Sequence, residues 1–408
     1  MRYEQELLSN MSFVPFGDLL LEPLRNGLTK PKAVRGDGVK MIGMGEIFAN
    51  SRIGAISMSR VPVTEKELSN NCIKNGDILF ARQSLALEGA GKCSIVIDVT
   101  EETVFESHLI RARIDSSKAN PYFVYYYFNS YVGKEHIKTI VEQVAAAGIR
   151  GSDLVRLKVP CPDLETQDRI AAILSALDEK IAINRAINDN LEQQVLAMYR
   201  NKFIDTTNAE RTICRADEFF DISIGKTPPR KESQWFSNNP EDVTWVSISD
   251  MGSCGLYIRK SSERLTQEAV KRFNIKVVPD NTVLLSFKLT VGRIAITNGE
   301  MTTNEAIAHF KTDCKSINEY LYCFLRCFNF ETMGSTSSIA TAVNSKIIKG
   351  MPFVVPTNYE LKEFHDIAAP MFAQIKANQN EIYNLTALRD TLLPKLMSGE
   401  LDVSAIEL

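Results

Sequence analysis

A repeat with a spacing of 194 residues is the feature that most constrains how this chain folds. The segments from Ile149 to Pro162 and from Val343 to Pro356 align at this spacing, and each reads as a polar loop, a short apolar strand and a proline-marked turn. Without a gap, the same spacing continues into two long segments with apolar positions alternately four and three residues apart, the pattern of a coiled-coil seam. The seam positions are Ile170, Leu174, Leu177, Ile181, Asn184, Asn188, Leu191, Val195 and Met198 in the first copy, and Phe364, Ala368, Met371, Ile375, Asn378, Ile382, Leu385, Arg389 and Leu392 in the second. The pattern predicts two copies of a unit in which a head is followed by a long helix.

The two heads match more loosely than the helices. GLTKP, from Gly27, corresponds to GKTPP, from Gly225, and the strand-like IKNGDILFAR, from Ile73, corresponds to VVPDNTVLLSF, from Val277. The predicted fold is α+β, with two mixed α/β heads separated by two long helices that form an antiparallel coiled coil in a pseudo-twofold repeat. The predicted boundaries are an N-terminal segment (1–11), head one (12–163), a central spacer helix (164–204), head two (205–358), and a C-terminal spacer helix with its tail (359–408).

The direction of the second helix follows from the short connection between the first helix and head two. Only a short polar stretch, Asp205 to Glu210, joins them, so the second helix buries its seam on the first only by running back antiparallel. Asn184 and Asn378 are equivalent core positions near the middle of each helix. We expect them to face each other and to fix the register, as a core asparagine does; the alternative is that both lie on solvated edges.

Composition excludes several other classes of protein. The chain has 408 residues and eight cysteines without a C-x-x-C pair, and its four histidines lie far apart in sequence, which argues against a disulfide framework or a structural zinc site. It has no apolar run long enough for a membrane span and no signal-peptide pattern at its start, so we expect no membrane association and a cytoplasmic location.

A succession of short motifs resembles the specificity subunit of type I restriction-modification enzymes. In the second half these are GKTPP, Trp245 to Asp250 (WVSISD), VVPDNTVLLSF, TVGRIAI, Asn304-Glu305-Ala306 and SKIIKGMPFVVP before the long helix. In the first half, SDLVRLKVPCPDLETQDRIAAILSALDEKI matches the family's strand that leads to a glutamine, here Gln167, near the start of the spacer helix. Head one lacks the WVSISD run, and the second helix has Lys362 or Glu363 in place of that glutamine.

The resemblance implies a bacterial or archaeal protein that selects double-stranded DNA without chemistry of its own. Each head, as a target-recognition domain, would read one half of a bipartite, asymmetric site. The helices would set the spacing and dock two methyltransferase subunits, and restriction/translocase subunits would complete the complex. S-adenosylmethionine, ATP and Mg would then be bound by the partner subunits, with no cofactor or metal on this chain.

The distribution of charge agrees with DNA-binding heads. The net charge of −3 divides into −1 on the first eleven residues, +2 on head one, −1 on the first helix, +1 on head two and −4 from Tyr359 onward. Basic residues also cluster near turn or aromatic residues, where they suit phosphate contact and base readout. The candidate DNA-binding residues are Lys30, Lys32, Arg35, Arg52, Arg60, Arg82, Lys92 and Arg150 in head one, and Lys226, Arg230, Lys231, Trp235, Lys260, Lys288, Arg293 and Lys346 in head two.

Two alternatives remain open at this point. The first is a standalone DNA methyltransferase or nuclease, to which Asn120-Pro121-Tyr122-Phe123 bears a partial likeness, although it lacks a second proline and a glycine-rich cofactor loop upstream. S-adenosylmethionine binding or metal-dependent cleavage by the isolated chain would favour it. The second is a coiled-coil scaffold with heads that do not read DNA.

Overall fold

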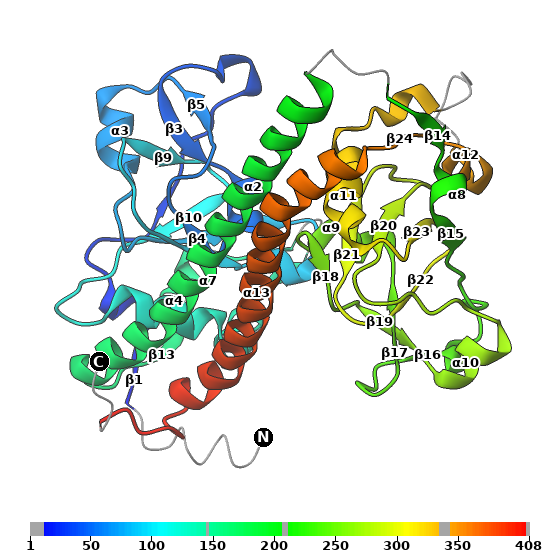
Figure 1. Cartoon of the computed structure of the whole chain (residues 1–408). Helices are drawn as coiled ribbons and strands as arrows, with labels where there is room; N and C mark the ends of the chain where they lie inside the picture. Colours follow the sequence, from blue (N-terminus) through cyan, green and yellow to red (C-terminus); the bar gives the residue numbers. More distant parts are fainter. Residues whose placement is uncertain (1–11, 144–146, 206–210, 334–342, 405–408) are drawn as a thin grey trace. The chain divides into compact units, whose positions relative to one another are not determined.

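The computed structural model describes residues 12–143, 147–205, 211–333 and 343–404, so the predicted N-terminal segment 1–11 lies outside the described residues. The chain divides into two compact units (Figure 1), one of residues 1–180 with 384–408 and the other of residues 181–383. Each unit therefore contains one head and part of each long helix.

The two long helices are α7 (Leu164–Tyr199), which continues as a π-helical turn over Arg200–Ile204, and α13 (Asn358–Met397). Polar side chains satisfy the free N–H groups where each helix begins. The Asp163 carboxylate accepts a hydrogen bond from the Thr166 N–H at 2.8 Å, and Thr357 and Glu360 form a reciprocal pair at the start of α13. The long helices expected from the seam are thus present.

The predicted antiparallel pairing is found in each unit separately. In the first unit, Ile170 and Leu174 near the start of α7 share a core with Leu396 near the end of α13. In the second unit, Tyr199 at the end of α7 packs edge-on against Phe364 near the start of α13, with ring centroids 6.0 Å apart. The start of one helix meets the end of the other in both cases, which confirms the coiled-coil direction.

The two seam asparagines are both buried, Asn184 at 1 % exposure and Asn378 at 5 %. They do not hydrogen-bond each other; each bonds a residue on the opposite helix that lies about one turn beyond the other asparagine. Asn184 Nδ2 donates to Glu381 Oε2 at 2.8 Å, and Asn378 Nδ2 donates to Asn188 Oδ1 at 2.9 Å. The solvated-edge alternative therefore does not hold. The two asparagines remain our candidates for fixing the register, through these partners.

Replacing both asparagines tests their role in register. The double variant Asn184→Leu/Asn378→Leu is expected to raise the melting temperature, because a polar core residue costs stability. An all-apolar seam also tolerates other registers, so the variant should reduce methylation by the complex that the sequence resemblance implies. Thermal denaturation and a methylation assay measure the two effects. Unchanged methylation would contradict a register role.

Head one is built on a five-stranded mixed sheet in the order β2-β10-β6-β8-β4, in which β4 is parallel to β8 and the other neighbours are antiparallel. The strands of this sheet are β2 (Arg25–Asn26), β10 (Leu109–Ala112), β6 (Ile78–Ala81), β8 (Cys93–Val96) and β4 (Arg52–Ile53). Smaller sheets are formed by β5 (Ser59–Val61), β3 (Val39–Ile42) and β9 (Thr103–Phe105), by β11 (Glu142–Gln143), β12 (Ala147–Gly148) and β7 (Gln83–Ser84), and by β1 (Phe13–Pro15) with β13 (Lys158–Pro160). The shorter α-helices of head one are α2 (Met44–Ala49), α3 (Glu65–Asn71), α4 (Pro121–Asn129), α5 (Tyr131–Lys138) and α6 (Gly151–Leu154).

Head two repeats this topology. Its main sheet has the order β15-β23-β20-β21-β18, again with one parallel pair, β18 with β21, at the same edge. Its strands are β15 (Asp221–Ile224), β23 (Ile307–Lys311), β20 (Val283–Ser286), β21 (Ile294–Thr297) and β18 (Tyr257–Ile258). The smaller sheets are β16 (Phe236–Ser237), β19 (Glu263–Leu265), β17 (Val243–Val246) and β22 (Thr302–Thr303), and β14 (Ile213–Arg215) with β24 (Pro352–Val354). Its α-helices are α8 (Ala216–Phe219), α9 (Ile248–Ser253), α10 (Gln267–Arg272), α11 (Asn318–Cys327) and α12 (Ser345–Lys349). The shared strand order confirms the internal repeat.

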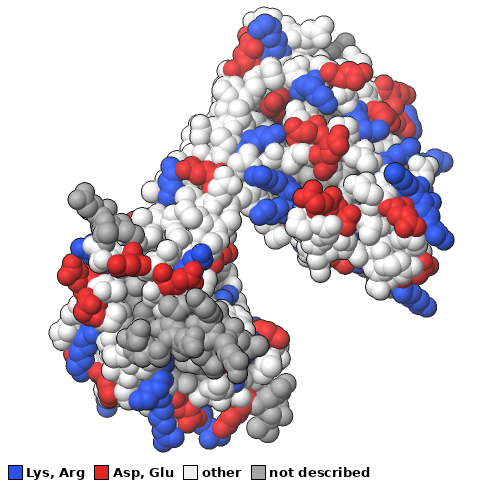
Figure 2. Space-filling view, turned by 90° about the horizontal axis from the view of Figure 1, so that it is seen from below, with Lys and Arg blue, Asp and Glu red and all other residues white. Residues whose placement is uncertain are grey.

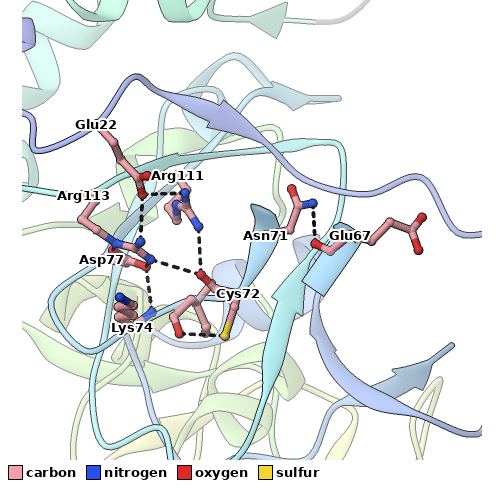
Figure 3. Close-up of polar contacts among 9 residues, drawn as sticks. Glu22, Glu67, Asn71, Cys72, Lys74, Asp77, Arg111 and Arg113 are labelled. Atoms are coloured by element: carbon pink, nitrogen blue, oxygen red, sulfur yellow. Dashed lines mark hydrogen bonds and ion pairs between the residues drawn. The ribbon is translucent and has the colours of Figure 1, made fainter. Parts of the chain in front are cut away.

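A buried ion network ties the main sheet of head one to its surrounding loops (Figure 3). Arg113 donates through Nε and Nη2 to the two carboxylate oxygens of Asp77, each at 2.7 Å, and Asp77 is only 1 % exposed. Arg111 and Arg113 also share one oxygen of Glu22 at 2.7 and 2.8 Å, and both donate to the Cys72 carbonyl. Since each buried charge has a partner of opposite sign, the network is compatible with burial.

Candidate nucleic-acid interface

The two loops predicted to correspond, GLTKP and GKTPP, occupy the same place in the two heads. Each loop begins with a glycine that has no room for a side chain. A Cβ added to Gly27 would lie 2.1 Å from the Phe105 carbonyl oxygen, and a Cβ added to Gly225 would lie 2.1 to 2.3 Å from atoms of Thr303. Each loop also has a main-chain hydrogen bond one residue later, from Leu28 N to Phe105 O at 2.8 Å and from Lys226 N to Thr303 O at 2.9 Å. Only glycine permits this close approach of two backbones.

In head two this loop presents Arg230 in a fixed orientation. The guanidinium lies over the rings of Phe236 and Trp245, 4.5 Å from each centroid, and its Nη1 donates to both oxygens of Glu263 at 2.9 and 2.8 Å. The side chain is nevertheless 51 % exposed. Stacking and ion pairing hold Arg230 in place while half of its side chain remains exposed.

Arg230 belongs to a small mixed-charge patch around Glu305. The Thr227 hydroxyl donates to the Glu305 carboxylate. Burial acts to raise the pKa of Glu305, but this hydrogen bond and the nearby charges of Lys288 and Arg230 hold the pKa below its ordinary value. The carboxylate is therefore ionised at neutral pH, and the structure brings the predicted residues Arg230 and Lys288 together around it.

Several predicted cations of head one are engaged in ion pairs on the same surface loops. Lys30 pairs with Glu67 at 2.9 Å, Arg60 pairs with Glu101 at 2.7 Å, and Arg35 lies 3.9 Å from Glu106. Lys30 is mostly buried, with 16 % of its side chain exposed, whereas Arg60 is 41 % exposed. Figure 2 shows the same interspersion of basic and acidic side chains on the visible face of each unit.

Three predicted residues pack into a core cluster or against a long helix. Trp235 is 5 % exposed in a core cluster of head two, and its indole N–H donates to Glu232 at 2.7 Å, so it is not available for base stacking. Arg52 is 12 % exposed and pairs with Glu179 of α7 at 3.3 Å. Lys260 lies over the ring of Tyr383 of α13. The sequence did not distinguish these packing roles from DNA contact, because the partners Glu179 and Tyr383 and the core around Trp235 come from distant segments of the chain.

The other predicted residues lie on loops or at element ends. Lys226 donates to the Phe273 carbonyl at 3.2 Å, Lys92 donates to the Phe48 carbonyl at 2.8 Å, Arg293 donates to the Ile248 carbonyl at 2.6 Å, and Arg150 pairs with Glu142 at 2.6 Å. Lys32, Lys231 and Lys346 are exposed, and Arg82 is half-buried.

The WVSISD motif of head two has a structural counterpart in head one that has a different sequence. Strand β17 ends in the WVSISD run, where Ser247 N donates to the Asp250 carboxylate at 2.8 Å to open α9. At the same place in head one, Gly43 N donates to the Glu46 carboxylate at 2.9 Å to open α2. The absence of WVSISD from head one is thus a change of side chains within a retained strand-to-helix turn. The acidic residue three positions after the cap was the available signal.

The comparisons with known proteins bear directly on this paired arrangement. The family model for the type I restriction modification DNA specificity domain matches twice, over residues 14–193 and 210–386. The chain belongs to this DNA specificity family. It is accordingly a DNA-recognition subunit of a type I restriction-modification system.

Relatives and solved structures of the family agree. The chain is 27 % identical to the type I restriction enzyme MjaIX specificity subunit of Methanocaldococcus jannaschii over 310 residues, covering 70 % of each protein. It is 21 % identical to the HindI specificity subunit of Haemophilus influenzae, covering 82 % of this chain and 88 % of that protein. The crystal structure of the S subunit of the type I restriction-modification system from M. genitalium has the same fold, with a TM-score of 0.57 at 16 % identity, covering 95 % of this chain and 96 % of that one.

Two kinds of feature are absent from the described residues. Among them, no three His, Cys, Asp or Glu side chains gather as a metal site would require. Within the same ranges, no helix combines the length and apolar character of a membrane span.

Beneath the GKTPP loop, head two contains a fully buried histidine. His309 on β23 hydrogen-bonds Ser223 Oγ through Nδ1 at 3.0 Å and Thr303 Oγ1 through Nε2 at 2.7 Å. Burial lowers its pKa to about 3, so the ring is neutral in the folded head. Two hydroxyls that both donate and accept suit a neutral imidazole.

Head two is therefore expected to lose stability on acidification. In the unfolded chain the pKa of a histidine is about 6.5, so between pH 6.5 and the much lower folded pKa only the unfolded state binds the proton. The free energy of unfolding therefore decreases as the pH falls below about 6.5. The expected loss attributable to His309 is about 2 kcal/mol at pH 5 relative to pH 7. Denaturation followed by tryptophan fluorescence measures it, since both tryptophans, Trp235 and Trp245, lie in head two. In His309→Gln the pH dependence should flatten; an equal slope in that variant would show that other groups cause it.

Proposed function

We propose that the chain is a non-catalytic specificity subunit in which each head reads one half of a bipartite, asymmetric DNA target. The observation that carries this is that two heads with one strand order differ in their loops, while the helices that follow them keep a gap-free repeat. Divergent loops suit two different half-sites, and repeated helices suit two copies of one partner.

In this proposal α7 and α13 set the spacing of the half-sites and dock two methyltransferase subunits. Restriction/translocase subunits complete the complex in the cytoplasm, and S-adenosylmethionine, ATP and Mg are bound by the partners. The isolated chain should accordingly bind no S-adenosylmethionine and cleave no DNA, and either activity would contradict the proposal.

The proposed DNA face keeps the predicted residues that neither pack into a core nor contact a long helix. Arg230 is the best-supported base reader, because a stacked, half-exposed guanidinium presents donors that match guanine O6 and N7 or a phosphate. Trp235, Arg52 and Lys260 are left out, since the first lies in the core and the other two contact the long helices. The remaining candidates are Lys30, Lys32, Arg35, Arg60, Arg82, Lys92, Arg150, Lys226, Arg230, Lys231, Lys288, Arg293 and Lys346.

Mapping modified adenines across the genome of a host that carries this chain and its methyltransferase subunits tests the proposal. We expect one motif with two defined halves separated by an unspecified spacer. A contiguous motif, or none, would overturn it.

Arg230→Ala should relax base specificity in the half-site read by head two and leave the other half-site unchanged, because each head reads its own half. The same adenine mapping measures this change.

A further inference from the structure

Each head carries an equivalent hairpin from its main sheet, β6 to β8 in head one and β20 to β21 in head two. The strand pairs have matching registers, with Ile78 opposite Ile95 and Val283 opposite Ile296. Near the end of each connection a glycine with positive φ donates its N–H to the last residue of the first strand. These glycines are Gly91, which bonds the Ala81 carbonyl at 2.8 Å, and Gly292, which bonds the Ser286 carbonyl at 3.0 Å.

Both hairpins hold a fully exposed leucine near their tips. Leu85 is 101 % exposed and Leu289 is 100 % exposed. Among the described residues, the next most exposed large hydrophobic side chain, Tyr359, reaches 70 %. Single exposed hydrophobic residues are ordinary, but a fully exposed leucine in the same hairpin of both heads calls for a partner that buries it.

Leu289 is held outward by an unusual backbone. Its φ is +61°, which is rare for a bulky residue, and Thr290 N bonds Lys288 O at 2.6 Å across it in a γ-turn. The buried Ser286 hydroxyl fixes the turn by donating to Thr290 O at 2.6 Å and accepting from Arg293 N at 3.0 Å. Such strain persists only where surrounding contacts impose it, and it is concentrated at functional sites.

The charges beside the tips favour nucleic acid as the partner. Hairpin one carries Arg82, Glu88 and Lys92, and hairpin two carries Lys288 and Arg293, so each has a net positive charge. The acidic neighbour of hairpin two is Glu305, close to Lys288. Basic side chains around an apolar tip match phosphates on either side of a base step.

The differences between the hairpins argue against a shared protein partner at this place. The connections run over residues 82–92 in head one and 287–293 in head two, so they differ in length as well as sequence. Two copies of one partner subunit would require similar surfaces, which the helices supply and these loops do not. An apolar wedge between bases reads no sequence, so both heads can use one even where their half-sites differ.

We propose that Leu85 and Leu289 are wedges that press into the base stack of their half-sites and lower the cost of extruding the adenine to be methylated. This inference rests on the proposed function, in which each head places a target base before a methyltransferase subunit. Enzymes that modify a base must first take it out of the stack, and any group that fills or opens that step makes extrusion easier.

The test uses the full chain assembled with its methyltransferase subunits and a duplex carrying the mapped target. Leu289→Ala is expected to slow methylation of the adenine in head two's half-site about tenfold without changing the motif, and Leu85→Ala to do the same for head one's half-site. Leu289→Met, which keeps an apolar bulk, should retain most of the rate. The matched controls Val277→Ala in head two and Leu21→Ala in head one remove exposed apolar side chains elsewhere and should leave the rate unchanged.

A rescue experiment separates a wedge from other roles. On a duplex with an abasic site opposite the target adenine, extrusion is already easy, so Leu289→Ala should methylate within about twofold of the unaltered protein. An equal deficit on this duplex, or loss of the methyltransferase subunits from the complex, would overturn the wedge and, in the second case, indicate a protein contact. If the unaltered complex methylates no bipartite target, the proposed function itself fails, whereas normal methylation by both alanine variants removes only the wedge.

Discussion

Methylation at the native target is expected to be lost when seven residues are inserted into both long helices at the boundary between the two units. The insertions go between Lys180 and Ile181 of α7 and between Tyr383 and Asn384 of α13. One heptad adds about 10 Å, or roughly three base pairs, to the proposed spacing while keeping the seam in phase. Because every contact within each unit is retained, the chain should still fold and should select a target with the same two halves and a longer spacer.

Adenine mapping and circular dichroism together measure this outcome. The control is a single heptad inserted between Asn188 and Leu191 of α7, which displaces Tyr199 from Phe364 within one unit and should lower the melting temperature. Methylation of the native target by the double-insertion chain would show that the helices do not set the spacing.

Head one is expected to lose about 3 kcal/mol of stability in Asp77→Ala. Asp77 is 1 % exposed and receives two hydrogen bonds from Arg113, whose side chain is 15 % exposed, so the substitution leaves a largely buried guanidinium without its main partner. The remaining contacts of Arg113 to Glu22 and the Cys72 carbonyl limit the loss. Denaturant unfolding followed by far-UV circular dichroism measures it.

Two comparisons make the result specific. Tryptophan fluorescence reports only head two, so its transition should stay in place while the circular dichroism transition moves. Glu135→Ala breaks the exposed pair of Glu135 with Lys138 in the same unit and should change stability little. If Asp77→Ala were no less stable than Glu135→Ala, the network would contribute nothing to folding.

The sequence predicted the long helices and the repeat well because both are periodic. Seam positions such as Leu174 and Ala368 are fully buried, as their four-and-three spacing indicates. Loop residues carry no such periodicity. Arg52 and Arg230 look alike in the sequence, yet one is paired with α7 and the other lies over two aromatic rings with half of its side chain exposed.

Some equivalent turns in the two heads could not be predicted from the sequence, because different side chains form the same backbone turn. Gly43 with Glu46 and Ser247 with Asp250 open corresponding helices, although only the second pair belongs to the recognised run. The exposure of Leu85 and Leu289 could not be predicted either, because the sequence does not indicate whether a leucine in a loop is packed or exposed.

By itself, then, the sequence determined the duplicated architecture, the direction of the helices and the family, since these depend on spacing along the chain. The tertiary structure decided which residues are available for DNA. Asn184 donates to Glu381 and Trp235 packs in the core because of neighbours brought in from other segments, and Leu289 stands exposed because the Ser286 hydroxyl fixes a strained turn. Exposure and pairing arise from contacts between distant segments, which spacing along the chain does not encode.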